Sequence, residues 1–364
     1  MMVAALRQDT AEKPPEVAED KRVKIMLVDD SLTVRTVFSR MLAKEADFNV
    51  VATASTAERG LDELRSRAVD VVMLDLEMPG MGGLEALPKI LEISPSTKVL
   101  VISSLTAEGA EHTVEALRMG AADTMLKPRP GGFDDDYREQ LMDKIRALKG
   151  LPAEVAKRAA ARPVSRRAGK QPQVIAIGAS TGGIHALNLF LRKLSKDFML
   201  PVLITQHLPG SFIPVFARQM EVASGRQAVL ADEGVEIERG KLIIAPGHGH
   251  MVVRRKGTRF ETGLAYHPVK SGCTPSVDPM FESLAEAYDG EVAGVLLSGM
   301  GRDGTDGAES IVKAGGSIYA QDAKSCAVWG MPRAITEMGL ATACLPPEEL
   351  AQSILDKAGA QAWR

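Results

Sequence analysis

The feature that most restricts the fold of this chain is a repeated alternation between short buried apolar runs and amphipathic segments of helical length. The alternation begins at Val23, where VKIMLVDD has the pattern of a buried strand ending in acids and SLTVRTVFSRMLAKE follows as an amphipathic helix. Strands that alternate with helices predict an α/β fold, in which helices cover both faces of a parallel sheet. A chain of 364 residues is longer than one compact domain usually is, so two such domains are expected.

The alternation is interrupted once, at residues 149–172, KGLPAEVAKRAAARPVSRRAGKQP. This segment is basic, contains Ala, Pro and Gly, and has no sustained apolar stripe, although PAEVAKRAAA could form a short helix. Its position between two patterned halves favours a linker over a nucleic-acid-binding tail. Residues 1–22 turn charged and Pro-containing at once and are predicted to be a disordered lead, which leaves domains at 23–148 and 173–364.

The predicted elements follow the apolar periodicity of each half. In the N-terminal half, strands are expected at VKIMLV, NVVATAS, VDVVMLD, KVLVISS and DTMLKP, and the later helices at 83–93, 108–118 and 135–148. In the C-terminal half, strands are expected at 173–178, 201–206, 227–231, 241–245, 292–298 and 316–320. Helices are expected there at 182–194, 211–222, 277–288, 304–314 and 347–358, and a β-hairpin at 250–268.

Composition excludes several classes of protein. The net charge is −3 and no basic face stands out in the second half, which argues against nucleic-acid binding. No apolar run approaches the length needed to span a bilayer, so direct membrane insertion is not expected. The odd set of Cys273, Cys326 and Cys344 has no metal-ligand spacing, which indicates reduced thiols in a cytoplasmic protein.

Several predicted strands of the N-terminal half end in groups suited to phosphoryl chemistry. Asp29 and Asp30 follow the first strand, Asp75 ends the third and Lys127 follows the fifth. Ligands bind at the carboxyl ends of parallel strands, so three carboxylates placed there would form an oxygen site for Mg²⁺, beside a lysine able to bind an anion. Any one of these aspartates could instead cap a helix, but the full set at strand ends favours phosphoryl transfer onto one carboxylate.

The motifs VDDS, LDLEMPGMGG and LKP, in this order, closely resemble the receiver domain of bacterial response regulators. The resemblance implies a flavodoxin-like parallel sheet in which Asp75 accepts a phosphoryl group from a histidine kinase. It also implies that Asp29, Asp30, Asp75 and the backbone carbonyl of Glu77 hold Mg²⁺.

The same resemblance implies that Lys127 and Ser103 contact the phosphoryl group. Ser103 has two close competitors for that role, Ser104 and Thr106, in the segment ISSLTA.

In the C-terminal half, Ser180 lies in VIAIGASTGG, a G-x-S-x-G match between a predicted strand and a predicted helix. This context is what a nucleophile elbow requires, but a glycine loop that binds phosphate has similar local residues. A dinucleotide-binding unit should show an acid at the end of its second strand, and PVLITQH ends instead in His207. No lysine follows the glycines, so a P-loop also fails, and His207 lies where a general base would be expected.

A catalytic triad also needs an acid, and VAGVLLSGMGRDGTDG supplies Asp303 and Asp306 on a glycine-rich loop after a buried strand. Asp306 is the weaker candidate, because an acid early in a helix commonly meets the helix dipole. His185 competes with His207 as the base, but its helical position points it away from Ser180. The order Ser, His, Asp differs from the familiar hydrolase orders, so a doubly wound sheet is expected in place of the usual α/β-hydrolase fold.

The motifs IAIGASTGG, ITQHLP, APG, TPSVDPMF, LSGMGRDG and WGMP together resemble the catalytic domain of the CheB family of chemotaxis protein-glutamate methylesterases. The resemblance implies hydrolysis of glutamate γ-methyl esters on chemoreceptors and deamidation of certain receptor glutamines, with no cofactor for the esterase reaction. Carried over, Ser180 is the nucleophile, His207 the base and Asp303 the acid. Thr181 and Met300 belong to the oxyanion and positioning elements. A receiver packed over the cleft would inhibit until it is phosphorylated.

Other residues invite weaker interpretations. His248 and His250 in APGHGHM suggest a metal, but without a nearby acid or cysteine a loop at the mouth of the active site is favoured. Cys273 and Cys326 do not sit on a strand-to-helix turn and are interpreted as space-filling. There are three rival classes of protein. A receiver-linked transcriptional regulator would need a helix-turn-helix, and the intact triad argues against a non-catalytic adaptor. The third, a hydrolase of related mechanism that acts outside chemotaxis, stays open on the sequence.

Overall fold

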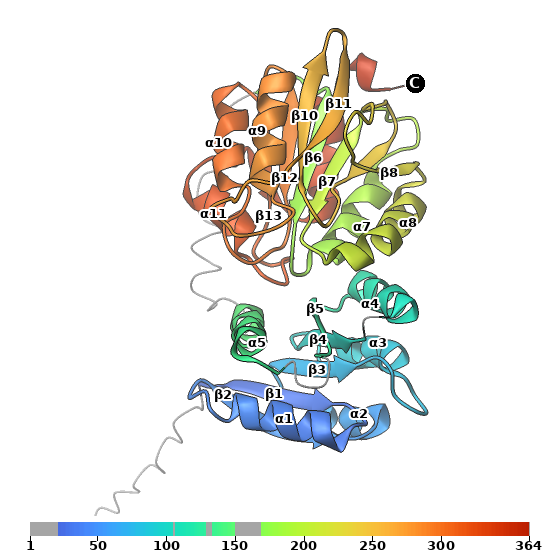
Figure 1. Ribbon diagram of the computed structural model, residues 1–364, viewed down its shortest axis with the longest axis vertical. Helices are drawn as coiled ribbons and strands as arrows, with labels where there is room; N and C mark the ends of the chain where they lie inside the picture. Colours follow the sequence, from blue (N-terminus) through green and yellow to red (C-terminus); the bar gives the residue numbers. More distant parts are fainter. Residues whose placement is uncertain (1–20, 105, 129–132, 150–168, 364) are drawn as a thin grey trace, which may run out of the picture.

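A computed structural model describes residues 21–104, 106–128, 133–149 and 169–363 of the chain. These residues form two α/β domains, one stacked on the other, which we call the N-terminal domain (21–149) and the C-terminal domain (169–363) (Figure 1). The predicted helix in PAEVAKRAAA and most of the predicted linker and lead lie outside the described residues.

The N-terminal domain is a five-stranded parallel sheet of order β2-β1-β3-β4-β5. Its elements are β1 Val23–Val28, α1 Leu32–Leu42, β2 Phe48–Ala54, α2 Ala57–Ser66, β3 Val71–Asp75, α3 Gly83–Ile93, β4 Lys98–Ser103, α4 Ala107–Met119, β5 Asp123–Leu126 and α5 Asp135–Leu148. The parallel sheet predicted from the strand–helix alternation is confirmed, as is the flavodoxin-like type that the receiver resemblance implies. Because β1 and β3 are adjacent, their carboxyl ends bring the predicted acids together.

The C-terminal domain is built on a seven-stranded sheet of order β14-β13-β12-β6-β7-β9-β8, in which every neighbouring pair is parallel. Its first elements are β6 Val174–Ala179, α7 Gly183–Lys193, β7 Val202–Gln206, the 3₁₀ turn η1 Gly210–Phe212, α8 Ile213–Ser224, β8 Ala228–Leu230, β9 Leu242–Ile244, β10 His250–Lys256 and β11 Arg259–Ala265. The rest are α9 Val277–Ala287, β12 Val292–Leu296, α10 Thr305–Lys313, β13 Ser317–Gln321, α11 Met331–Glu337, β14 Ala343–Leu345, α12 Pro347–Lys357 and η2 Ala360–Ala362.

The strand order explains how distant motifs meet. Strand β6 lies at the centre of the sheet with β7 on one side and β12 on the other, so the carboxyl ends of these three adjacent strands lie side by side. Ser180, His207 and the glycine-rich loop that carries Asp303 follow these three strands. The doubly wound parallel sheet is therefore confirmed, and β10 and β11 form the predicted antiparallel hairpin.

Strand β14, helix α11 and the short turn η2 were not predicted. Strand β14 has only three residues and helix α11 only seven, too few for an apolar period to be recognised in the sequence. Strand β14 exists because its backbone pairs with β13, a tertiary effect that has no local signal.

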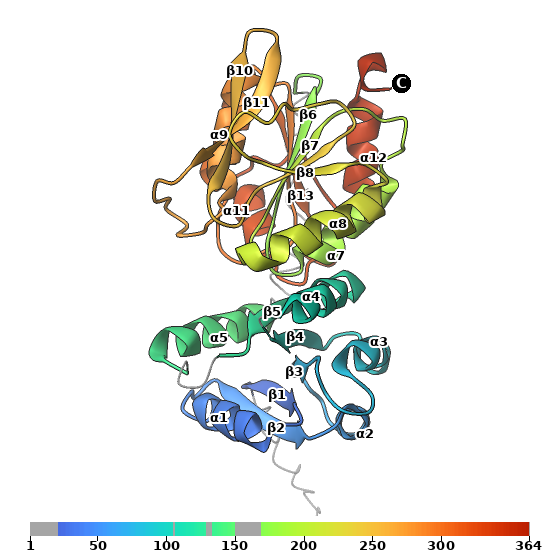
Figure 2. The ribbon, with the colours of Figure 1, turned by 45° about the vertical axis from the view of Figure 1, so that its right-hand side comes forward.

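The two domains meet mainly where α4 contacts α7, α8 and η1, and where the start of β5 reaches the turn after β6 (Figures 1 and 2). At the centre, the Thr181 hydroxyl donates to Asp123 Oδ2 at 2.6 Å. His185 Nδ1 lies 3.1 Å from the Arg118 carbonyl, and Val328 packs into an apolar cluster of the N-terminal domain.

Candidate active site

Ser180 occupies a sharp turn between β6 and α7. The backbone N–H of Ser180 donates to the carbonyl of Ser298 at 3.0 Å, which ties the turn to the end of β12. Gly182 has φ +75°, and a Cβ there would lie 2.4 Å from the Ala327 Cβ, so only glycine fits. This glycine lets the chain reverse directly into α7 and leaves the Ser180 side chain partly accessible, as the elbow prediction required.

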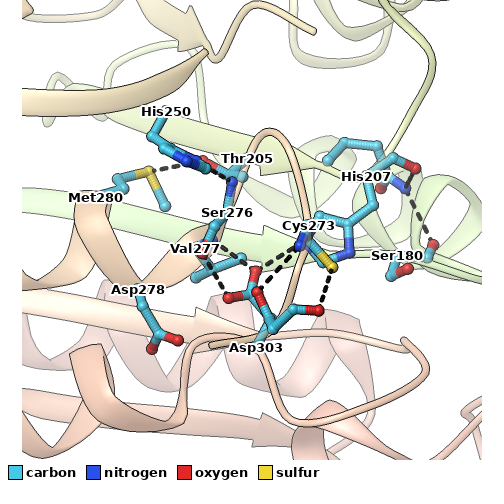
Figure 3. A network of polar contacts seen from close by, with 12 residues as sticks. Ser180, Thr205, His207, His250, Cys273, Ser276, Val277, Asp278, Met280 and Asp303 are labelled. Atoms are coloured by element: carbon cyan, nitrogen blue, oxygen red, sulfur yellow. Dashed lines mark hydrogen bonds and ion pairs between the residues drawn. The ribbon is translucent and has the colours of Figure 1, made fainter. Parts of the chain in front are cut away.

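His207 and Asp303 form a hydrogen-bonded pair, with His207 Nε2 2.8 Å from Asp303 Oδ2 (Figure 3). Asp303 is only 2% exposed and accepts two further hydrogen bonds, from the Ser276 hydroxyl at 2.6 Å and from the Val277 N–H at 2.7 Å. Three donors fix the carboxylate, and the carboxylate in turn orients the imidazole. Since Nε2 donates to Asp303, Nδ1 is the ring nitrogen able to accept a proton.

The electrostatics of the pair favour separated charges. Burial raises the pKa of Asp303, but hydrogen bonds from His207, Ser276 and Val277 outweigh burial and hold that pKa well below its ordinary value. Burial lowers the pKa of His207, but Asp303 and Cys273 overcome it and raise the pKa to about 9. Asp303 therefore favours its ionised form, which is the form that can stabilise an imidazolium.

The structure brings Ser180 beside this pair without joining them. The His207 backbone N–H donates to the Ala179 carbonyl at 3.0 Å, so the two residues lie on neighbouring strand ends. Among the described residues the Ser180 hydroxyl has no hydrogen-bond partner. In unliganded enzymes the contact between nucleophile and base is often loose and tightens with substrate.

Two backbone N–H groups beside Ser180 are unused. Neither the Thr181 nor the Met300 N–H donates to another group in the part of the chain that the structure describes. The loop after β12 comes so close that a Cβ at Gly299 would lie 2.9 Å from the Ser180 Cβ. Free donors next to a nucleophile are what an oxyanion hole needs.

The sequence did not indicate three residues that hold the candidate site groups in place. Ser276 holds Asp303, and Ser298 donates from its hydroxyl to the Thr181 carbonyl at 2.6 Å and accepts from the Val328 N–H at 3.0 Å. Asp123 of the N-terminal domain accepts from Thr181. TPSVDPMF and LLSGMG were visible in the sequence, but these serines act through tertiary contacts that spacing does not show.

His250 was interpreted as part of a loop at the mouth of the active site, and that interpretation is wrong. His250 begins β10 and is 2% exposed. Its Nδ1 accepts from the Ser276 N–H at 3.0 Å, and its Nε2 lies 3.0 Å from the His267 carbonyl. His250 thus supports Ser276 from behind, whereas His248 is exposed.

The sequence suggested that Cys273 only fills space, and the structure contradicts this interpretation. It is partly exposed, and its Sγ, a His207 ring nitrogen and an Asp303 carboxylate oxygen all lie within 4.8 Å of one another.

The weaker candidates for the triad lie elsewhere: His185 faces the N-terminal domain, and Asp306 pairs with Lys270 early in α10.

The predicted acids of the N-terminal domain also converge. Oxygen atoms of Asp29, Asp30 and Asp75 lie within 4.8 Å of one another. Lys127 Nζ is 2.5 Å from Asp75 Oδ2 and 3.5 Å from Asp29 Oδ2, and the Glu77 N–H donates to Asp75 Oδ1 at 3.0 Å. Burial outweighs the lysine and raises the pKa of Asp75 to about 6.

Two polar atoms in this cluster are buried without a hydrogen-bond partner, Asp29 Oδ2 and Ser103 Oγ. Ser104 instead donates to Glu77 at 2.5 Å. The unpartnered oxygens and the three carboxylates fit a hard divalent cation, and the free Ser103 hydroxyl favours Ser103 over Ser104 as the phosphoryl contact.

Comparison with known proteins agrees with this geometry. Residues 175–354 match the family model for CheB methylesterase, and residues 25–132 match that for the response regulator receiver domain. A protein-glutamate methylesterase/protein-glutamine glutaminase of Caulobacter vibrioides is 41% identical, covering 92% of this chain and 99% of the relative. One from Paramagnetospirillum magneticum is 39% identical, covering 94% and 97%. The crystal structure of the Thermotoga maritima CheB methylesterase catalytic domain matches with 31% identity and a TM-score of 0.50, covering 51% of this chain and 98% of that one.

Fold and site together define a receiver domain joined to a serine-hydrolase-like catalytic domain. The chain belongs to the CheB family of protein-glutamate methylesterases/protein-glutamine glutaminases. In the described part of the chain, no helix combines the length and apolarity that crossing a bilayer would demand.

Proposed function

We propose that this chain is a phosphorylation-regulated methylesterase that removes methyl groups from glutamate γ-methyl esters of chemoreceptors and deamidates specific receptor glutamines. The observation that carries the proposal is the buried His207–Asp303 pair, 2.8 Å apart, beside a serine on a strand-to-helix turn. Family membership supports the substrate class, since the Caulobacter and Paramagnetospirillum relatives are named for both activities.

The mechanism follows from these groups. Neutral His207 takes the proton of Ser180 as the hydroxyl attacks the ester carbonyl, and Asp303 stabilises the resulting imidazolium. The unused N–H groups of Thr181 and Met300 stabilise the oxyanion, and one such donor contributes about 3 kcal/mol to transition-state stabilisation. His207 then protonates the departing methanol. Water hydrolyses the glutamyl-enzyme by the same proton transfers in reverse, which restores glutamate.

The N-terminal domain supplies the regulation. Asp75 would accept a phosphoryl group from a histidine kinase, with Lys127 and Ser103 contacting it. Asp29, Asp30, Asp75 and the Glu77 carbonyl would hold Mg²⁺, which when bound neutralises charge on the phosphoryl oxygens. The unpartnered Asp29 Oδ2 supports this ligand set.

Regulation requires that the N-terminal domain affect the catalytic site, and the domain interface supports this. Thr181, next to the nucleophile, is buried under Asp123, so the N-terminal domain stands over one side of the elbow. A bulky receptor helix would be excluded until phosphorylation weakens this contact.

The test is methanol release from methylated chemoreceptor membranes by the full-length protein, with and without Mg²⁺ and a small phosphodonor. Release should rise with the phosphodonor, and Ser180→Ala should abolish it. Normal turnover by Ser180→Ala would refute the catalytic assignment. A matched control is Ser310→Ala, because the Ser310 hydroxyl bonds only the backbone of its own helix.

A further inference from the structure

We propose that His207, Cys273 and Asp303 form an inhibitory binding site for Zn²⁺ directly over the catalytic pair. The metal site itself rests on the geometry of these three residues. Only its effect on turnover rests on the proposed methylesterase function.

The geometry is close to that of a three-ligand zinc site. One ligand atom from each residue, a ring nitrogen, a thiol sulfur and a carboxylate oxygen, lies within 4.8 Å of the other two (Figure 3). Tetrahedral bonds of the usual zinc lengths place such atoms about 3.3–3.6 Å apart. His207 Nε2 and Asp303 Oδ2 are already 2.8 Å apart. Binding therefore requires this pair to separate by about 0.5 Å and the Cys273 sulfur to approach the other two atoms by at most about 1.5 Å.

The Cys273 thiol is available to a metal. Its hydrogen bond to the Ser271 carbonyl is weak at 3.8 Å, and the residue is partly exposed. Cys273 and Asp303 both line a cavity of about 360 Å³ that also contains Met300. An ion can thus reach the ligands from solvent. Cys344, by contrast, lies on the edge strand β14 and does not line this cavity.

The ligand chemistry selects the metal. Nitrogen, sulfur and oxygen donors together suit Zn²⁺, whereas the all-oxygen cluster at Asp75 suits Mg²⁺. Asp303 uses three of its roughly four acceptor positions, and the one facing His207 becomes free when the Nε2 proton leaves. Ser276 and Val277 would continue to orient the carboxylate, as second-shell donors do for metal-bound carboxylates.

Metal binding would stop catalysis for a specific reason. The thiol releases its proton to solvent when sulfur binds the ion. A neutral imidazole bound through Nε2 carries its one ring proton on Nδ1, so His207 has no nitrogen left to accept the Ser180 proton. Inhibition should therefore be complete at saturation and reversed by a chelator.

The activity test uses full-length protein, receptor membranes and Zn²⁺ set by a metal buffer, with each rate expressed relative to the metal-free rate of the same variant. The Zn²⁺ concentration that halves the rate should be at least about 10-fold higher for Cys273→Ser than for the parent. The reason is that losing even a residue that only supports a metal ligand lowers metal affinity by about 10–100-fold. Cys344→Ser is the matched control, because Cys344 is also only partly buried, and it should behave like the parent. Equal zinc sensitivity in Cys273→Ser, or an insensitive parent, would overturn the proposal.

A binding readout separates this proposal from the proposed function. Co²⁺ substituted for Zn²⁺ should give thiolate-to-cobalt charge-transfer absorption in the parent, in Ser180→Ala and in Asp75→Asn, but not in Cys273→Ser or Cys273→Ala. A band that survives both Cys273 substitutions would refute the site. A protein without esterase activity that still shows the Cys273-dependent band would retain the site and lose the proposed function.

Discussion

Replacing Thr181 with valine tests whether the N-terminal domain restrains the catalytic domain through one buried hydrogen bond. Valine keeps the size of the side chain and the backbone N–H proposed for the oxyanion, and removes only the hydroxyl that donates to Asp123 Oδ2 at 2.6 Å. Hydrogen bonds to charged groups contribute about 1.5–3 kcal/mol. Asp123 keeps Lys144 as a partner at 2.5 Å, so the loss should be near the lower end, about 1.5 kcal/mol.

We call molecules closed when the two domains are in contact and open when they are apart. Weakening the domain contact by about 1.5 kcal/mol raises the ratio of open to closed molecules by about tenfold. If receptors reach only the open form, methanol release by unphosphorylated full-length Thr181→Val should rise by about tenfold, up to the rate of the fragment 169–364. The same substitution in that fragment should leave release nearly unchanged. The stimulation by a phosphodonor should shrink by the factor that the basal rate gains.

The control lies at the same interface. Arg218 and Glu111 pair across the domains at 3.0 Å, but both side chains are more than 60% exposed. Exposed ion pairs contribute about 0–1 kcal/mol, so Arg218→Ala should change the basal rate little. If Thr181→Val changed turnover by the same factor in the full-length protein and in the fragment, Thr181 would act only within the catalytic domain and the proposed restraint would be wrong.

Three further predictions follow from individual groups. First, kcat/KM for demethylation should rise with pH through the pKa of His207, because only the neutral ring is a base. Since Cys273 raises that pKa, Cys273→Ser should move the rise in kcat/KM to lower pH. A pH profile that is the same in both proteins would contradict this. Second, Asp75→Asn should stabilise the protein against urea by about 3 kcal/mol at neutral pH, because burial raises the folded-state pKa from 3.8 to about 6. The folded state then holds its proton more tightly, so the ionised carboxylate costs stability above pH 6, and the advantage of Asn should disappear as pH falls toward 4. Third, Ser276→Ala removes a hydrogen bond of 2.6 Å to ionised Asp303, so kcat/KM should fall by about 10–100-fold with little change in KM, and unchanged kcat would show that the other two donors suffice.

How much of the site the sequence could predict depended on where each residue lies relative to a strand. Ser180 and His207 directly follow buried strands, and Asp303 lies on the loop after another. Parallel topology alone therefore brings all three to one edge. Ser276 and Cys273 lie on a loop between β11 and α9, and the fold of that loop depends on tertiary contacts such as that between Ser276 and His250. No periodicity could place Cys273 near His207, so its absence from a strand-to-helix turn led to the space-filling interpretation.

The contact between Thr181 and Asp123 was out of reach for a second reason. It joins domains whose motifs were analysed separately, and residues 149–172, which connect them, contain no pattern that specifies a docking geometry. Asp123 begins β5, and Lys127 follows the other end of the same strand. At about 3.3 Å per residue, this strand links the phosphoryl site to the interface over only about 13 Å. The proposed regulatory connection is thus short in space, and no local sequence pattern indicates it.

Inhibition by the N-terminal domain could act by blocking receptors or by distorting the catalytic groups, and a small ester distinguishes the two. The His207–Asp303 hydrogen bond and the unused Thr181 and Met300 N–H groups are all present while the domains are in contact. Because the machinery is assembled in this closed arrangement, we expect a small activated ester to be hydrolysed at similar rates by the full-length protein and by the fragment 169–364. Receptor demethylation should differ strongly between them. The alternative is that the N-terminal domain distorts the site, for example by keeping the Ser180 hydroxyl from its hydrogen bond to His207. Distortion would slow hydrolysis of both the small ester and the receptor ester in the full-length protein. A phosphodonor that accelerates the small ester as much as the receptor would refute blocking as the mechanism.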